Sequence, residues 1–153
     1  MKISIALFCI SLCLAGCSKD FLKSYDERII GTWQLTDVDR VGFGGNTANL
    51  PFTAGTFVFK EGGILIFTDP SGIVFNGTWD IEKKSIFVQT VDADGNAQLG
   101  SEQVRTLDIV AVDFASQVIR SEHFDVMEFK STNRFKTKLY SGAHTYVFTF
   151  KRN

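Results

Sequence analysis

The segment Asp92-Ala93-Asp94-Gly95-Asn96 holds three closely spaced oxygen-bearing side chains, and such side chains are the ligands that calcium prefers. A Ca²⁺ ion takes about six to eight oxygen ligands, and a calcium loop supplies another early ligand and a closing glutamate that this segment lacks. Asp-Gly is also a strong signal for a tight β-hairpin. We therefore interpret the segment as a turn, and we expect neither a metal site nor a cofactor.

The two histidines, His123 and His144, are the next candidates for chemistry, as acid or base catalysts. Neither belongs to an identifiable cluster of carboxylates and thiols, so we expect structural roles for both. The sequence contains no Gly-x-Ser-x-Gly nucleophile elbow. We therefore do not expect an enzyme.

The three thiols lie close to the N-terminus, at Cys9, Cys13 and Cys17. One cation, Lys2, precedes an uncharged and mostly apolar stretch that runs up to this last cysteine. The stretch of about a dozen residues is too short to span a bilayer, which takes roughly 20 helical residues. Small residues precede Cys17, as at a processing site, so residues 1–16 are expected to be a signal peptide that is removed.

The residues Leu14-Ala15-Gly16-Cys17 resemble the lipobox of bacterial lipoproteins. The resemblance implies that a lipoprotein signal peptidase cuts before Cys17 after its thiol has been diacylated. Stable anchoring takes more than one acyl chain, since each buried methylene contributes roughly 0.8 kcal/mol. The expected product is an outer-membrane lipoprotein of the cell envelope, facing the periplasm or the surface. Residues 17–28 would be its tether, and no disulfide would remain.

The rest of the composition fits one ordinary domain. The chain of 153 residues has a formal net charge of −1 and no basic stripe, so we expect no nucleic-acid binding. Its 15 phenylalanines predict an interior of large rings, which must stabilise the fold without disulfides.

From Ile29 onward, short apolar and β-branched runs alternate with turn residues about every ten positions, which is typical of an all-β sandwich or barrel. Turns such as Asp69-Pro70-Ser71-Gly72 indicate antiparallel connections. A short helical turn is expected near residues 21–28. The predicted strands are 29–38, 55–60, 64–68, 73–81, 85–91, 104–112, 118–129, 134–140 and 144–152.

Alternation along these strands predicts which side chains face inward, because neighbouring side chains in a strand point to opposite sides. The residues predicted to face inward are Phe57, Phe59, Phe75, Gly77, Trp79, Ile81, Tyr146, Phe148 and Phe150.

The residues Gly31-Thr32-Trp33, on the first predicted strand, are similar to the Gly-x-Trp motif of lipocalins. Lipocalins place a basic residue of the last strand over this tryptophan, and Arg152 has the strand parity to be that partner. Residues 29–153 as a whole resemble the small lipocalin-like lipoproteins of Bacteroidetes. The resemblance implies a single antiparallel barrel of eight to nine strands, closed at one end by Gly31, Trp33 and Arg152.

The same resemblance implies a binding protein that takes a small hydrophobic ligand in a barrel cup. A barrel of about eight strands has room for one small ligand or for its own side chains. The alternative is therefore an interaction protein with a solid core, whose loops bind a protein partner such as a transporter or an enzyme to be inhibited. Residues 41–46 form either a lid over the barrel mouth or a plain connection. The rings expected to line a cup are Phe57, Phe75, Trp79 and Phe148.

Overall fold

The computed structural model describes residues 23–44, 46–92 and 94–153. The predicted signal peptide, Cys17, the rest of the tether up to residue 22, Gly45 and Ala93 lie outside these ranges. Within them, no helix is long and apolar enough to cross a membrane. The elements in chain order are α2 (Tyr25–Ile29), β1 (Gly31–Gly42), η1 (Thr47–Asn49), β2 (Gly55–Lys60), η2 (Glu61–Gly63), β3 (Ile64–Thr68), β4 (Val74–Val91), β5 (Ala97–Asp113), β6 (Val118–Phe124), β7 (Val126–Ser131), β8 (Arg134–Ser141) and β9 (His144–Arg152).

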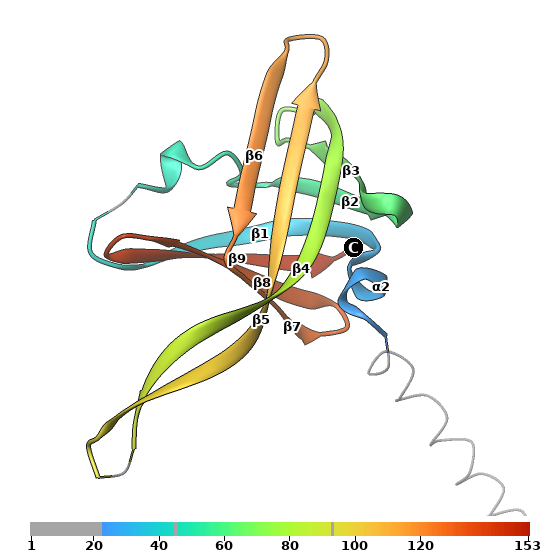
Figure 1. The fold of residues 1–153 in the computed structure, drawn as a ribbon. Coiled ribbons are helices and arrows are strands. Elements are labelled where there is room, and N and C mark those ends of the chain that lie inside the picture. Colours follow the sequence, from blue (N-terminus) through green and yellow to red (C-terminus); the bar gives the residue numbers. More distant parts are fainter. Residues whose placement is uncertain (1–22, 45, 93) are drawn as a thin grey trace, which may run out of the picture.

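The nine strands form one antiparallel sheet in the order β6-β5-β4-β3-β2-β1-β9-β8-β7. Strand β1 pairs with β2 on one side and with β9 on the other, so the first and last strands are neighbours. The sheet is rolled into a barrel-like shape in which β5 lies against β7 (Figure 1). No backbone ladder joins β6 to β7 in the described part of the chain. The prediction of an all-β, antiparallel fold of eight to nine strands is confirmed.

Three strands, β2, β3 and β9, have the predicted bounds. The predicted break between residues 81 and 85 is wrong, because β4 continues without interruption from Val74 to Val91. Glu82 and Lys83 suggested a turn there, but both side chains are exposed and both backbones pair with β5. A strand can contain charged residues of this kind where no other element packs against its face.

The predicted strand 118–129 is wrong as a single element. It divides into β6 and β7 at Asp125, whose carboxylate accepts a hydrogen bond from the backbone N–H of Tyr140 at 2.7 Å. At this residue the chain passes from β6, which pairs with β5, to β7, which pairs with β8. The predicted strand 104–112 is longer at both ends, since β5 runs from Ala97 to Asp113.

Large rings fill the interior, and every aromatic residue predicted to face inward is buried. Phe135 stacks on Phe150 with ring centroids 4.4 Å apart, and Phe57 meets Phe67 at 4.6 Å. Ring pairs of this kind contribute roughly 0.5–1.5 kcal/mol beyond the burial of their area. The core is therefore a connected network of aromatic contacts.

One end of the barrel, which we call the base, is covered by α2. The helix begins with a capping box in which the Ser24 hydroxyl accepts from the Glu27 N–H and the Glu27 carboxylate accepts from the Ser24 N–H. Tyr25 packs edge-on against Phe129 at 5.2 Å, and Ile29 is fully buried. The helix thus packs as part of the barrel and lies beside the C-terminus (Figure 1).

The longest hairpin extends beyond the barrel. Strands β4 and β5 pair along most of their length. In contrast, β3 pairs with β4 only as far as Thr78, and β6 pairs with β5 only from Leu107. The two-stranded part made of residues 85–91 and 97–103, which we call the ribbon, projects away from the rolled sheet (Figure 1). A two-stranded ribbon is marginally stable by itself. Both of its faces and both of its edges are available for contact.

Candidate functional site

The rings predicted to line a ligand cup pack against other rings. Phe57 and Phe148 are fully buried, and Phe75 is nearly so. Phe57 and Phe75 both contact Phe67, with centroids 4.6 and 5.5 Å apart, and Phe148 meets Phe124 edge-on at 4.9 Å. The space between these side chains is filled by their own neighbours.

Phe52, in the loop before β2, adds a buried ring that the sequence reasoning missed. It is fully buried and meets Phe57 and Phe67 edge-on at 5.4 and 5.0 Å. Strand alternation says nothing about loop residues, so its inward direction had no sequence signal. Phe52 plugs the end of the barrel opposite the base, which we call the mouth.

Trp79 is placed differently, since it lies near the surface beside the base. Its indole Nε1 donates to the carbonyls of Lys60 and Ile64, both at 3.1 Å. A surface hollow of about 380 Å³ adjoins the ring, and three carboxylates border it together with the apolar side chains of Ile30 and Trp79. The hollow is lined by Asp26, Glu27, Ile30, Glu61, Gly62 and Trp79.

The structure brings Gly31, Trp33 and Arg152 together at the base. The Arg152 guanidinium lies over the fully buried Trp33 indole, with its Cζ atom 4.4 Å from the ring centroid. Such a contact contributes roughly 0.5–2 kcal/mol, depending on burial. A Cβ atom at residue 31 would come within 2.8 Å of the Arg152 Nη1 atom. A side chain at this position would therefore clash with the guanidinium, and glycine avoids the clash.

The same two side chains bind three successive carbonyls at the end of α2. Arg152 donates from Nη2 to Arg28 at 2.6 Å and from Nη1 to Ile30 at 3.1 Å. The Trp33 Nε1 atom donates to Ile29 at 2.7 Å. The last carbonyls of a helix have no partner within the helix, so these bonds satisfy groups that would otherwise be unpaired.

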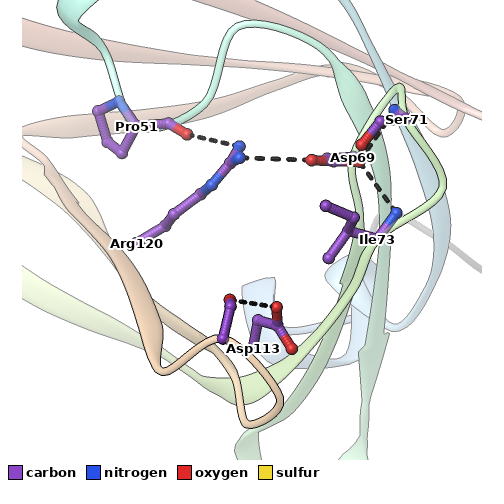
Figure 2. Close-up of polar contacts among 7 residues, drawn as sticks. Pro51, Asp69, Ser71, Ile73, Asp113 and Arg120 are labelled. Atoms are coloured by element: carbon purple, nitrogen blue, oxygen red, sulfur yellow. Dashed lines mark hydrogen bonds and ion pairs between the residues drawn. The ribbon is translucent and has the colours of Figure 1, made fainter.

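An ion pair fastens the mouth (Figure 2). Arg120, on β6, donates to the Asp69 carboxylate and to the Pro51 carbonyl, each at 3.3 Å. The buried Asp69 carboxylate also accepts from the Ser71 hydroxyl at 2.6 Å and from the Ile73 backbone N–H at 3.0 Å. Arg120 therefore joins β6 both to the turn between β3 and β4 and to the loop that carries the plugging ring.

Asp69 should make the fold sensitive to acid. The Ser71 hydroxyl, followed by the backbone N–H groups and the Arg120 guanidinium, holds the pKa of Asp69 below its ordinary value, although burial acts the other way. The native state then binds fewer protons than the unfolded chain, so stability is lost as the pH falls through the lowered pKa. In urea unfolding, the stability difference between the wild type and Asp69→Asn should therefore narrow from pH 6 to pH 3. A difference that is constant over this range would contradict the assignment.

His123 has a partner that the sequence did not reveal. Its Nδ1 atom lies 2.6 Å from the Asp108 Oδ1 atom, because the β5–β6 register sets the two residues opposite each other. His144 instead packs edge-on against Tyr146 at 4.9 Å. Among residues 23–44, 46–92 and 94–153, no group of three or more His, Cys, Asp or Glu side chains could hold a metal ion. The His123–Asp108 pair is exposed and joins β5 to β6.

The ribbon exposes large apolar side chains that belong to regular strands. Phe87 is 87% exposed, Leu99 81% and Val91 68%. The β4–β5 register puts all three on one face, since Gln89 pairs with Leu99 and Phe87 pairs with Ser101. These three are the most exposed large apolar side chains of the described strands, and we take the face that they share as the candidate functional site.

The ribbon also lacks the usual protection of a free strand edge. Natural edges carry lysine or proline, which discourage pairing with other chains. Residues 85–103 contain no lysine, arginine or proline, and their charged residues are Asp92, Asp94 and Glu102. An edge without such protection is a surface on which another chain can pair.

The tip of the ribbon is the turn that first suggested a metal site. The Asp92 carboxylate accepts from the backbone N–H groups of Asn96 at 2.8 Å and Asp94 at 3.0 Å. These bonds, with the largest share from Asn96, hold the pKa of Asp92 below its ordinary value. Gly95 has a φ of +86°, as the turn requires. The oxygens of Asp92 thus serve the turn itself.

Comparison with known proteins found no match to a family model, a curated protein or a solved structure.

Proposed function

We propose that this chain is a lipid-anchored protein of the bacterial cell envelope, held at the outer membrane, which acts by binding a protein partner rather than by catalysis. The observation that carries the proposal is the ribbon, because Phe87 and Leu99 are more than four-fifths exposed although they lie in regular strands. Apolar side chains gathered on one exposed face are typical of protein contact sites. Aromatic residues in such sites often contribute most of the binding energy.

The filled interior supports binding at the surface over binding in a cup. A carrier needs an empty space of a few hundred Å³ for a small ligand. Here Phe57, Phe75 and Phe148 are buried against other rings, Phe52 plugs the mouth and Arg120 fastens it. The solid-core alternative is therefore the one that the geometry favours.

The lipobox-like residues that end at Cys17 support the anchoring part of the proposal. Helix α2 is the first element of the described chain and lies at the base, which supports the attachment of a lipid anchor at this end of the barrel. A partner confined to the same membrane layer is met at a raised effective concentration, and a modest contact surface is then sufficient.

Photocrosslinking in cells tests the binding proposal. With benzoylphenylalanine at position 87, irradiation should give a discrete protein adduct. Phe43 offers a matched control, since it is also aromatic and is 89% exposed, but it lies in the loop after β1. The same probe at position 43 should give no such adduct. Equal yields at both positions, or none at 87, would count against the ribbon as the contact site.

The same cells test the anchor through incorporation of an alkyne-labelled fatty acid. The wild type should be labelled and Cys17→Ser should not. Cys13→Ser is the control, because Cys13 lies in the expected leader and its loss should leave the labelling unchanged. Labelling that survives Cys17→Ser would disprove lipidation at this residue.

A further inference from the structure

We propose that a surface hollow between the β7–β8 turn and the end of β9 is an anion site, which binds the phosphate group of an anionic phospholipid headgroup. The hollow has a volume of about 390 Å³, and we call it the basal hollow because Arg152 at the base lines it. The inference goes beyond the protein contact proposed above and rests on the anchoring part of that proposal. It follows from the charges that line the hollow and from the length of chain between the base and Cys17.

Four cations line the basal hollow, and they come from three neighbouring strands. The other two lining residues have a hydroxyl and an amide side chain, which can donate hydrogen bonds to phosphate oxygens. Within the described part of the chain, no carboxylate lines it. Lysine and arginine are the usual phosphate-binding residues, and the planar guanidinium matches two phosphate oxygens at once. The lining residues are Lys130, Ser131, Asn133, Arg134, Lys151 and Arg152.

Two of these cations lie directly opposite each other. Arg134 pairs with Lys151 in the β8–β9 register, and both side chains are exposed. In residues 23–44, 46–92 and 94–153, neither of them forms an ion pair. Like charges in a direct cross-strand pair are destabilising. An anion bound beside the two side chains would remove this repulsion.

Arg152 adds a positive charge that its contacts do not balance. Its guanidinium donates to the carbonyls of Arg28 and Ile30 and lies over the Trp33 indole, and all of these groups are uncharged. These contacts also hold the guanidinium in one place. A charge that is already fixed binds an anion without the cost of ordering a flexible side chain.

Two carboxylates lie close to these cations, and they do not cancel the positive charge. Glu128 forms an ion pair with Lys130, which leaves the other three cations of the basal hollow unbalanced. Glu27 lines an adjoining hollow of about 240 Å³, but Lys23 and Arg28 line that hollow as well. Both hollows therefore have more cations than carboxylates.

Other carboxylates of the base lie on another side of it. Asp26 and Glu61 border the hollow beside Trp79, which shares no lining residue with the basal hollow. Asn153 does not line the basal hollow either, and its backbone N–H donates to the Thr32 carbonyl on β1 at 3.1 Å. The base therefore has a cationic side, formed by β7, β8 and β9, and an acidic side next to η2.

The short chain between the proposed anchor and the base favours a lipid headgroup as the source of the phosphate. Cys17 precedes Lys23 by six residues, which span at most about 20 Å when extended. Lys23 lines the hollow that adjoins the basal one. An anchor of this length holds the cations near the headgroups at a raised effective concentration. Each cation close to an anionic lipid surface then strengthens binding about fivefold.

Crosslinking to lipid tests the site with the lipidated protein purified from membranes. The protein is reconstituted into vesicles of phosphatidylcholine alone, and into vesicles with equal amounts of phosphatidylcholine and phosphatidylglycerol. Benzoylphenylalanine replaces Thr132, which is exposed in the β7–β8 turn and lines the adjoining hollow. After irradiation, the yield of protein–lipid adduct should be about fivefold or more higher in the mixed vesicles.

Two double variants separate the site from the net charge. Arg134→Gln with Lys151→Gln should lower the yield in the mixed vesicles to that in phosphatidylcholine alone. Lys84→Gln with Lys138→Gln is the matched control, because it removes two charges at positions outside the basal hollow, and it should leave the yield unchanged. The first variant should also unfold at the same or a higher urea concentration than the wild type, because a repulsion is removed. Unfolding would then not explain its loss of adduct.

The inference is overturned if the yield is the same in both kinds of vesicle, or if both double variants lower it equally. Inorganic phosphate should not displace the lipid when sodium chloride of the same ionic strength does not. Displacement by phosphate alone would identify a dissolved phosphate compound as the ligand and overturn the lipid assignment. In cells, a protein adduct from position 132 in place of a lipid adduct would overturn it in favour of an acidic protein.

Failure of this inference can be told apart from failure of the proposed function. If the vesicle experiment fails while Cys17 is labelled by the fatty acid and position 87 gives its protein adduct, the proposed function stands without the anion site. If the wild type is not labelled at Cys17, the anchor is disproved and the inference is overturned with it.

Discussion

Gly77→Ala is expected to destabilise the protein by about 3 kcal/mol or more, at the upper end of the usual range for overpacking. A Cβ atom at this position would lie 1.8 Å from the Val110 carbonyl oxygen and 2.7 Å from its carbon. These are backbone atoms of the neighbouring strand, so no side-chain rotation relieves the clash. Residues 77 and 111 are paired in the β4–β5 ladder, and this ladder must open or shift. Urea unfolding followed by circular dichroism measures the loss.

Gly100→Ala is the matched control for this prediction. Gly100 lies in the same β4–β5 pair of strands, but the nearest atom to its added Cβ would be a Val88 methyl at 3.7 Å, an ordinary contact distance. Alanine is also less flexible than glycine in the unfolded chain, so the free energy of unfolding should stay the same or rise slightly. Similar losses in both variants would show that the close approach of Val110 is not the cause.

Trp33→Ala should cost about 3–5 kcal/mol, the usual range for removing a large buried ring. The side chain is fully buried, meets Phe135 edge-on at 4.7 Å, and lies under the Arg152 guanidinium. Its loss also leaves the Ile29 carbonyl without its hydrogen bond, which is a further cost for a buried group. The free energy of unfolding in urea is the quantity to measure.

Trp33→Phe helps to separate the two contributions, since it removes the donor but keeps a ring, although a smaller one, in the same place. It should lose clearly less stability than the alanine variant, and Phe43→Ala, at an exposed position, should change stability by no more than about 0.5 kcal/mol. Equal losses for Trp33→Phe and Trp33→Ala would mean that the hydrogen bond to Ile29, rather than the packing of the ring, holds the base together.

Several features of the fold follow from local patterns in the sequence. Alternation identified the inward rings of β2, β4 and β9, because burial of one face imposes a period of two. Strand parity also put Arg152 on the same face as Phe148 and Phe150, which is the face that meets Trp33. These features depend on a few neighbouring residues, and a sequence records such relations directly.

Other features depend on where neighbouring strands stop. Phe87 and Leu99 look, in the sequence, like the half-buried residues of any strand. They are exposed because they lie in the part of the hairpin that extends beyond the rest of the sheet. Strand β3 pairs with β4 no farther than Thr78, and β6 pairs with β5 only from Leu107. Strand length in one part of the chain therefore decides exposure in another, and no local pattern contains that information.

The mouth could not be predicted for a related reason. Arg120 and Asp69 are 51 residues apart, and their contact depends on the register of three strand pairs between them. Phe52 stands in a loop, where periodicity gives no direction. Long-range polar contacts of this kind become visible only when the sheet has been assembled.

The three carbonyls at the end of α2 also define a path for mechanical load. Any pull on a lipid anchor would enter the domain at α2, and Arg152 and Trp33 hold the carbonyls of Arg28, Ile29 and Ile30. Because β1 and β9 are neighbours, the force divides at once between the first and last strands in the middle of the sheet. The two neighbouring strands β1 and β9 would therefore carry the load together, and Arg152 is the side chain through which α2 is linked to β9.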